Sequence, residues 1–326
     1  MDPTCNNCRV TDNGDLLSRR QMLSQLGAGC GSLGLAAMLQ AGQSQAATGT
    51  GGLHLPPRAK HVIFLFMNGG PSQLDTFDPK PALKKYAGQK PPEVPGRTIS
   101  GGYLPSPFRF AKHGESGLEV SETLPHLAGV VDQLCLIRSM QTDSPNHEPA
   151  ILQMHTGHVQ PTRPALGSWL TYGLGTENQD LPGFVVLRPR DGIVVGPALW
   201  SSAFLPGEFQ GTSVITREMQ VEKLIKNLKN AKWSPAEQRA QLDLLQQLNE
   251  LHREQPLGDS RLNAEIAAMA TAFRMQKSAL RDLDIMQEPA SVRQLYGESG
   301  FGKSALLARR LAEAGVRVTT VYYTEE

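Results

Sequence analysis

The sequence has few cysteines, no excess of charge and no long apolar run. Four of its 326 residues are cysteine, and three of these, Cys5, Cys8 and Cys30, lie near the N-terminus. Cys5 and Cys8 have no second pair at metal-ligand spacing, so we expect no metal there. Lys+Arg (32) balance Asp+Glu (31) to a net charge of +1, which argues against nucleic acid or an anionic membrane as partner. Beyond the N-terminal segment no apolar run approaches the roughly 20 residues of a membrane span, so we expect no stable span.

What the sequence does contain is enough apolar side chain for a large core. Hydrophobic residues make up 40% of the chain and charged residues 19%, which is typical of a globular protein. The length favours one large domain or two smaller ones. The 32 glycines and 23 prolines predict many loops and turns.

The first 46 residues have the organisation of an export signal. Paired arginines stand in Ser18–Leu23, a mild apolar stretch covers Leu26–Leu39, and Ser44–Ala46 forms a small-x-small cleavage site. This order predicts a twin-arginine signal over residues 1–46, with the translocase as partner and a periplasmic or extracellular destination. The alternative is an ordinary N-terminal helix with an incidental arginine pair. Residues 47–58 are predicted to be a linker, and Cys135 is the one cysteine left after cleavage.

Alternating apolar runs and helical segments predict an α/β fold with a mostly parallel sheet. Continuous apolar runs are typical of strands buried on both faces, and we expect strands at 61–67, 134–140, 184–187 and 316–322. Helices are expected at 124–131, 149–156 and 305–314, the second with Ile151, Leu152 and Met154 turned inward. The segment 75–110 is expected to be a long surface loop.

A helical insertion is predicted at about 216–288. Ser234–Glu237 has the capping-box pattern with Pro at the first helical position. Leucines follow at helical spacing, and a second apolar stripe runs from Leu262 to Phe273. We expect an antiparallel helical hairpin whose stripes serve packing.

The first candidate site follows the first expected strand. Asn68 ends that strand, Gly69 and Gly70 allow close approach of backbone to a ligand, and Asp75 and Asp78 follow. Carboxylate and amide oxygens suit hard metal ions, so Asn68, Asp75 and Asp78 are candidate metal ligands. The residue types allow equally that the aspartates only cap turns.

The second candidate site follows the second expected strand. Thr142 to His147 combines hydroxyls, a carboxylate, an amide and an imidazole at a strand-to-helix junction. A hydroxyl there suits a nucleophile, Asn146 suits an oxyanion donor, and the helix N-terminus favours an anion. The alternative is that Ser144 or Asn146 caps the helix. His155, at the far end of that helix, is expected to be solvated unless it binds a metal.

A third pattern, Gly297–Ser304, matches the phosphate-loop spacing. A phosphate loop requires a buried strand directly before its first glycine, and the preceding residues Ser291–Tyr296 do not have the composition of a core strand. We therefore expect no nucleotide at Lys303.

Several longer segments resemble one exported family. They are Lys60–Pro81, Asn146–His147, Gly167–Asn178, Leu181–Leu187 and Leu306–Arg317. Together they resemble the family called domain of unknown function 1501, over residues from about 15 to 318. That family is placed in the alkaline phosphatase and sulfatase superfamily. The resemblance therefore implies a doubly wound α/β sheet over residues 59–326, two divalent metal ions (Zn, Ca, Mg or Mn) and a hydroxyl nucleophile.

The resemblance also implies roles for particular residues. Thr142 corresponds to the nucleophile and Asn146 to the oxyanion donor, with His147 beside them. The spacing to Asn146 is one residue longer than in the related phosphodiesterases, so Ser144 or Asp143 is an alternative at the nucleophile position. Asn68 stands where the superfamily normally has a metal-binding aspartate, and Asn is the weaker ligand. No Cys-x-Pro-x-Arg motif is present, which disfavours the formylglycine route of sulfatases.

The function expected from this resemblance is an exported, metal-dependent hydrolase of phosphate or sulfate esters, on a small-molecule or polysaccharide substrate. Family members continue with further His and Asp residues, whereas this chain diverges after about Val318. We therefore expect a C-terminally truncated member with an incomplete fold and metal centre. The alternative is a non-catalytic exported binding or scaffold protein, or an inactive homologue.

Overall fold

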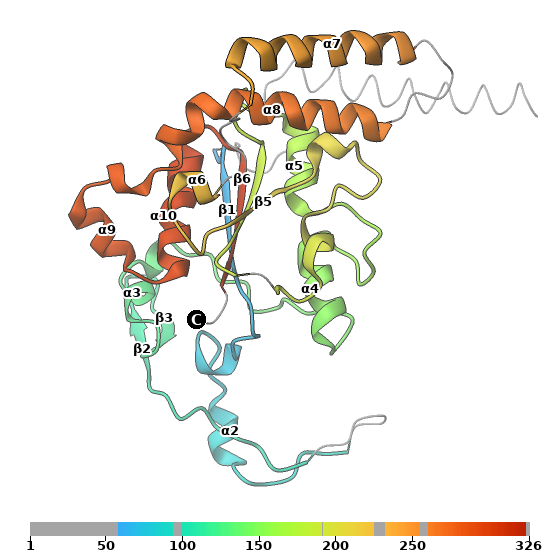
Figure 1. The fold of residues 1–326 in the computed structure, drawn as a ribbon. Coiled ribbons are helices and arrows are strands. Elements are labelled where there is room, and N and C mark those ends of the chain that lie inside the picture. The colour runs from blue at the N-terminus through green and yellow to red at the C-terminus, as the bar shows by residue number, and fades with distance from the viewer. Residues whose placement is uncertain (1–57, 94–99, 191, 225–231, 254–259, 324–326) are drawn as a thin grey trace, which may run out of the picture. The chain divides into compact units, whose positions relative to one another are not determined.

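A four-stranded parallel sheet forms the centre of the fold (Figure 1). In this computed structural model the strands lie in the order β1 (Val62–Met67), β6 (Val318–Tyr323), β4 (Phe184–Arg188) and β5 (Thr212–Ile215). Each neighbouring pair is parallel. The predicted α/β class with a mostly parallel sheet is confirmed, as are three of the four predicted strands. The fourth strand of the sheet, β5, is one that the sequence analysis does not predict.

The structure describes residues 58–93, 100–190, 192–224, 232–253 and 260–323. Lys60–Glu326 belong to one compact unit. The predicted signal, 1–46, and nearly all of the predicted linker, 47–58, lie outside the described residues and stay predictions. Within the described part, no helix is long and apolar enough to cross a membrane.

The two inner strands are buried because helices cover both faces of the sheet. β4 buries its first four residues and β6 its first five. On one face, α10 (Gly300–Glu313) packs through Leu307 and Leu311 against β4 and β6. On the other, α4 (His147–Thr156) and α5 (Leu166–Leu174) cover an aromatic-rich core (Figure 1). The predicted helices at 149–156 and 305–314 are confirmed, but Met154 is exposed rather than inward.

β1 corrects an expectation, because it is not buried on both faces. It is the outer strand of the sheet next to β6, and its residues alternate between half-buried and exposed. Ile63, Leu65 and Met67 are 39%, 49% and 46% exposed. A continuous apolar run therefore does not by itself distinguish a central strand from an outer one.

The sequence predicts a buried strand at 134–140, but the structure shows no strand there. Leu134, Ile137 and Met140 are exposed. A strand needs a neighbour for its backbone hydrogen bonds, and among the described strands β1 pairs with β6 alone. Arg138, in this segment, lies 4.0 Å from the Asp78 carboxylate.

The predicted insertion is helical. It contains α6 (Val221–Leu224), α7 (Pro235–Arg253) and α8 (Ser260–Asp282), and α7 packs against α8 (Figure 1). The capping box is confirmed: the Ser234 hydroxyl and N–H both donate to Glu237, and the Glu237 N–H donates to Ser234 Oγ at 3.3 Å. The apolar stripe of α7 is packed only in part, since Leu245 and Leu248 are exposed.

Shorter elements occupy the remaining segments. They are η1 (Gln73–Asp75), α2 (Pro81–Lys85), the antiparallel hairpin of β2 (Phe110–His113) and β3 (Leu118–Ser121), α3 (Pro125–Ala128), η2 (Val131–Gln133), η3 (Gly196–Trp200), η4 (Gly207–Phe209), η5 (Ile285–Gln287) and α9 (Ala290–Tyr296). The expected loop at 75–110 thus contains a helix, and the helix expected at 124–131 is shorter and is followed by a 3₁₀ turn.

Candidate functional site

The carboxyl ends of the four parallel strands lie at one edge of the sheet. Met67 of β1 is in register with Tyr323 of β6, and Arg188 of β4 with Ile215 of β5. In open α/β sheets, ligands bind in the crevice outside this edge. Asn68 directly follows β1, so the first candidate site begins at the expected place.

The candidate metal ligands do not form a set that fits a two-metal centre. Asp78 is engaged by Lys80 at 2.8 Å and faces Arg138 at 4.0 Å. Asp75 lies in η1, and Asn68 is half-buried before Gly69. Within the described ranges, no three His, Cys, Asp or Glu side chains are grouped to hold a metal ion.

Thr142, Asn146 and His147 lie together in one turn that leads into α4, although no strand precedes it. The Thr142 hydroxyl donates to the Ser144 carbonyl at 2.9 Å, and the Asn146 N–H donates to Ser144 Oγ at 3.2 Å. Asn146 occupies the N-cap position of α4, but its side chain makes no capping hydrogen bond. The sequence leaves open that the Asn146 side chain caps α4, and the structure shows that it does not.

The two candidate groups are not joined by polar contacts in the part of the chain that the structure describes. Among the described residues, no hydrogen bond or ion pair joins Asn68, Asp75 or Asp78 to Thr142, Asn146 or His147.

Arg188 is a site residue that the sequence analysis missed. It ends β4, its Nε donates to Ser213 Oγ of β5 at 2.7 Å, and its guanidinium lies 5.3 Å from the ring centre of Trp200. Both contacts fix the orientation of the guanidinium at the carboxyl edge. A guanidinium held in this way is suited to bind a carboxylate, phosphate or sulfate group.

Beneath this edge, a buried aromatic cluster joins α4 to the sheet. The His155 ring stacks on Tyr322 of β6, with centroids 5.5 Å apart and planes 9° apart, and packs edge-on against Phe66 of β1 at 4.6 Å. His155 Nδ1 donates to the Ile151 carbonyl at 2.8 Å, which leaves the Nε2 lone pair buried without a partner in the described chain. Burial lowers the pKa of His155 and raises that of Tyr322, the second opposed by the charge of Arg188.

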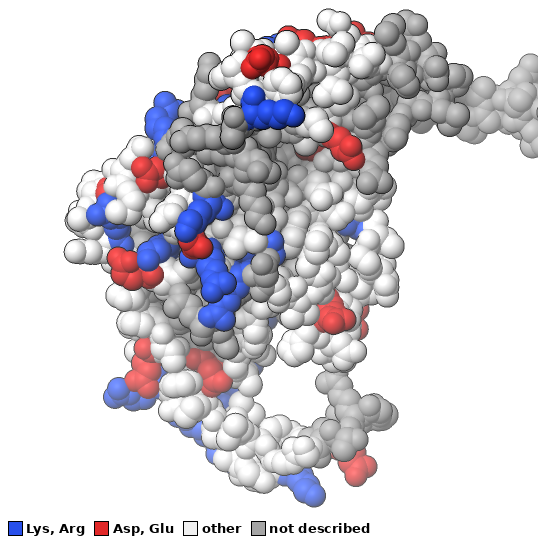
Figure 2. All heavy atoms as spheres, viewed as in Figure 1, with Lys and Arg blue, Asp and Glu red and all other residues white. Residues whose placement is uncertain are grey.

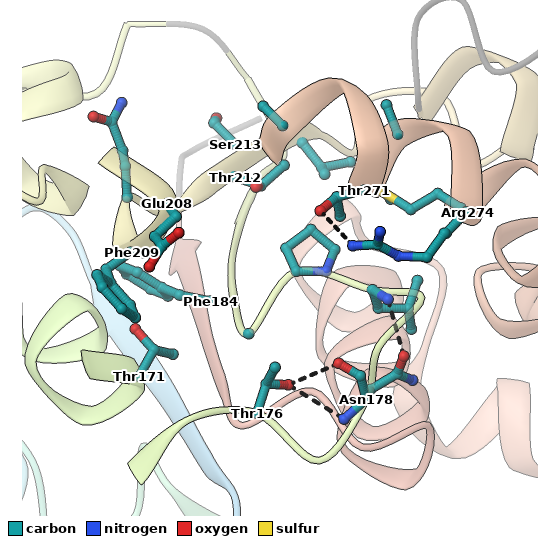
Figure 3. A pocket seen from close by; sticks show the side chains of 18 of the residues that line it. Thr171, Thr176, Asn178, Phe184, Glu208, Phe209, Thr212, Ser213, Thr271 and Arg274 are labelled. Atoms are coloured by element: carbon teal, nitrogen blue, oxygen red, sulfur yellow. Dashed lines mark hydrogen bonds between the residues drawn. The ribbon is translucent and has the colours of Figure 1, made fainter. Parts of the chain in front are cut away.

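A cavity of about 680 Å³ lies alongside β5 (Figure 3). All four residues of β5 line it, together with residues from the loop before β4, from η4, from α6 and from α8. Figure 3 shows Phe184 and Phe209 together on one side and Thr271 with Arg274 on the other. Its lining also includes Arg188, so the cavity reaches the carboxyl end of β4.

The comparisons with known proteins gave one match. A family model described as "Protein of unknown function (DUF1501)" matches residues 59–325. The chain belongs to the DUF1501 family. Searches of curated proteins and of solved structures found no match.

Basic side chains predominate among the charged residues that line the cavity beside β5 in this DUF1501 protein. Arg188, Lys223 and Arg274 line it, against one acidic residue, Glu208. Lys223 pairs with Glu218, and this hydrogen bond lowers the pKa of that carboxylate. Figure 2 shows Lys and Arg gathered on the face that carries α6 and β5. The charge here favours an anionic ligand.

The phosphate-loop pattern of this DUF1501 chain has a structural explanation. Helix α9, not a strand, precedes Gly297. Ser299 caps α10 by accepting the Gly302 N–H at 3.0 Å, and Ser304 is buried in contact with the Thr216 hydroxyl at 2.6 Å. Lys303 pairs with Glu298 at 2.9 Å. These residues start and anchor a helix.

Proposed function

We propose that this protein binds phosphate or sulfate esters at the carboxyl edge of its sheet and hydrolyses them, as an exported sulfatase- or phosphatase-like protein. The observation that carries the proposal is the oriented Arg188 guanidinium at the end of β4, held by Ser213 and Trp200. A planar guanidinium can bind two oxygens of a phosphate or sulfate group at once. The proposal that the bound ester is hydrolysed rests on the family resemblance.

Thr142 is the proposed nucleophile. Its segment leads into α4, α4 packs against η3, and Trp200 of η3 lies against Arg188. α4, which follows Thr142, thus packs against the element whose Trp200 contacts the residue proposed to hold the ester. In the reaction, the Thr142 oxygen bonds to phosphorus or sulfur and loses its proton, while the bond to the alcohol oxygen breaks and the leaving alcohol takes up that proton. Water then attacks phosphorus or sulfur, the bond to Thr142 breaks, the Thr142 oxygen regains a proton from the water, and phosphate or sulfate leaves. In both steps the Asn146 amide donates to the developing charge.

Two substitutions test this proposal. In a panel of 4-nitrophenyl phosphate and sulfate with Zn, Ca, Mg or Mn added, we expect Thr142→Ala to abolish hydrolysis by the full chain. We expect Arg188→Gln to lower kcat/KM about 10- to 1000-fold, because it removes a charge-assisted contact of about 1.5–4 kcal/mol.

Arg239→Gln is the matched control, because Arg239 lies on α7 and pairs there with Asp243. We expect it to behave as the wild type. Unchanged turnover in Thr142→Ala would refute the assignment of the nucleophile.

A non-catalytic binding protein is the second candidate. The observation that favours it is that, within the described ranges, no three His, Cys, Asp or Glu side chains are grouped for a metal. On this proposal the panel shows no turnover with any metal, while Arg188 still determines the affinity for inorganic phosphate or sulfate.

A further inference from the structure

We infer that the cavity beside β5 is a binding site for amphipathic anions, with the acid group at Arg188 and an apolar body lying along β5. The inference rests on the proposed function, since Arg188 belongs to both, and it adds the class of ester that the protein takes. Simple inorganic anions or esters of small alcohols leave most of the cavity unfilled.

The size and the apolar walls of the cavity carry the first part of the inference. A volume of about 680 Å³ lies within the range of small-molecule sites, which is roughly 300–1,000 Å³. The apolar side chains that line it include Leu181, Phe184, Phe209, Val214, Leu224 and Met275. Burying an apolar group here gains the hydrophobic contribution that a free inorganic anion cannot.

The outer edge of β5 adds polar groups along the same wall. β5 is the outermost strand of the described sheet on that side, and the Thr216 N–H donates to the Arg188 carbonyl at 2.7 Å. In a parallel ladder, alternate residues point their backbone groups toward the neighbouring strand. Ser213 and Ile215 therefore direct theirs outward, into the wall of the cavity. These groups suit ester or hydroxyl oxygens of a ligand.

Two guanidinium groups lie near opposite ends of this wall. Arg188 ends β4, whereas Arg274 donates to the Gln179 carbonyl, before β4 begins, at 2.7 Å, and to Thr271 at 3.1 Å. The five residues of β4 span about 13 Å. We place the acid group at Arg188, because Arg188 is half-buried, which reduces solvent screening, and lies at the edge where α/β ligands bind.

The test compares three probes by calorimetric titration of the full chain. Naphthalene-2-sulfonate has both the acid group and the apolar body, methanesulfonate has the acid group alone, and naphthalene-2-methanol has the body without the charge. We expect naphthalene-2-sulfonate to bind at least tenfold more tightly than either of the others. Arg188→Gln should lower its affinity about tenfold or more, and Arg239→Gln should leave the affinity unchanged.

A second pair of variants tests the cavity itself. Ala272 lines it from α8 and is exposed, so Ala272→Trp fills the space without disturbing the core. We expect a loss of tenfold or more in naphthalene-2-sulfonate affinity. Ala240→Trp on the exposed surface of α7, outside the cavity lining, is the control and should bind as the wild type does.

The outcomes separate this inference from the proposed function. Equal binding of both sulfonates, still dependent on Arg188, overturns the apolar subsite and leaves the proposed function standing. Tight binding of naphthalene-2-methanol but of neither sulfonate overturns both. If Arg274→Gln abolishes binding and Arg188→Gln does not, the acid group binds at the Arg274 end of the cavity wall and the inference is wrong. No binding of any probe also overturns it.

Discussion

His155 is a residue whose environment predicts a pH dependence of stability. The residue is 4% exposed, and burial lowers its pKa from the ordinary value of 6.5. The folded state therefore takes up a proton at His155 less readily than the unfolded chain, which does so below about pH 6.5. We expect the free energy of unfolding to fall as the pH drops below 6.5, by at most about 1.4 kcal/mol per pH unit, and to be insensitive to His155 above it.

Urea unfolding between pH 5 and 8, with His155→Phe beside the wild type, measures this effect. The variant keeps the aromatic packing against Phe66 and Tyr322 and removes the titrating group. Its unfolding free energy should depend less steeply on pH between 5 and 6.5. His158→Phe is the control, since His158 lies in the loop after α4 and is half-buried, whereas His155 is buried. Equal slopes in the wild type and His155→Phe would contradict the prediction.

At the scale of elements, Gly302 allows the first turn of α10 to pack closely against the end of α9. A Cβ at this position would overlap the Tyr296 carbonyl oxygen of α9, because the two helices approach closely there. We expect Gly302→Ala to lower the free energy of unfolding by about 1–3 kcal/mol, despite the better helix propensity of alanine. Gly173→Ala in α5, where a Cβ meets nothing within 4 Å, is the control and should not destabilise.

Lys303→Ala completes that experiment. Lys303 pairs with the exposed Glu298, so its loss should change stability by less than about 1 kcal/mol. Thermal or urea unfolding of the three variants checks these expectations. Strong destabilisation by Lys303→Ala, with none by Gly302→Ala, would contradict the explanation that the Gly297–Ser304 pattern serves helix packing.

The elements with strong local signals are those the sequence predicts well. β4 has four apolar residues before Arg188, and β6 consists of β-branched and aromatic residues. Ser234 with Glu237 forms the capping box that its spacing requires. β5 has four residues, two of them Thr and Ser, and only its pairing with β4 identifies it as a strand. The segment 134–140 has a strand-like composition, but strand formation also needs a neighbour, which composition cannot show.

At the scale of the whole molecule, the sheet order decides which residues share a site. The sequence identifies Asn68 and the Thr142 turn because each combines polar types near an apolar run. It does not show that β6 lies between β1 and β4. That order brings Tyr322 of β6, His155 of α4 and Trp200 of η3 into one cluster, and Arg188 onto Trp200. Such contacts join residues distant in the sequence, so no local pattern could have revealed them.

The pairing of β1 with β6 also affects how the protein can be exported. β1 begins at Val62 and pairs with β6, which begins at Val318, so this pairing can form only after more than 250 further residues have been made. A route that carries folded proteins suits such a topology, and we propose that Arg19 and Arg20 direct the chain to it. Arg19→Lys with Arg20→Lys should block export and leave the full-length chain in the cytoplasm. Fractionation and mass determination of the mature N-terminus measure this, with Arg9→Lys, outside the pair, as the control expected to be exported and cleaved near Ala46. Normal export of the double variant would show that the arginine pair is incidental.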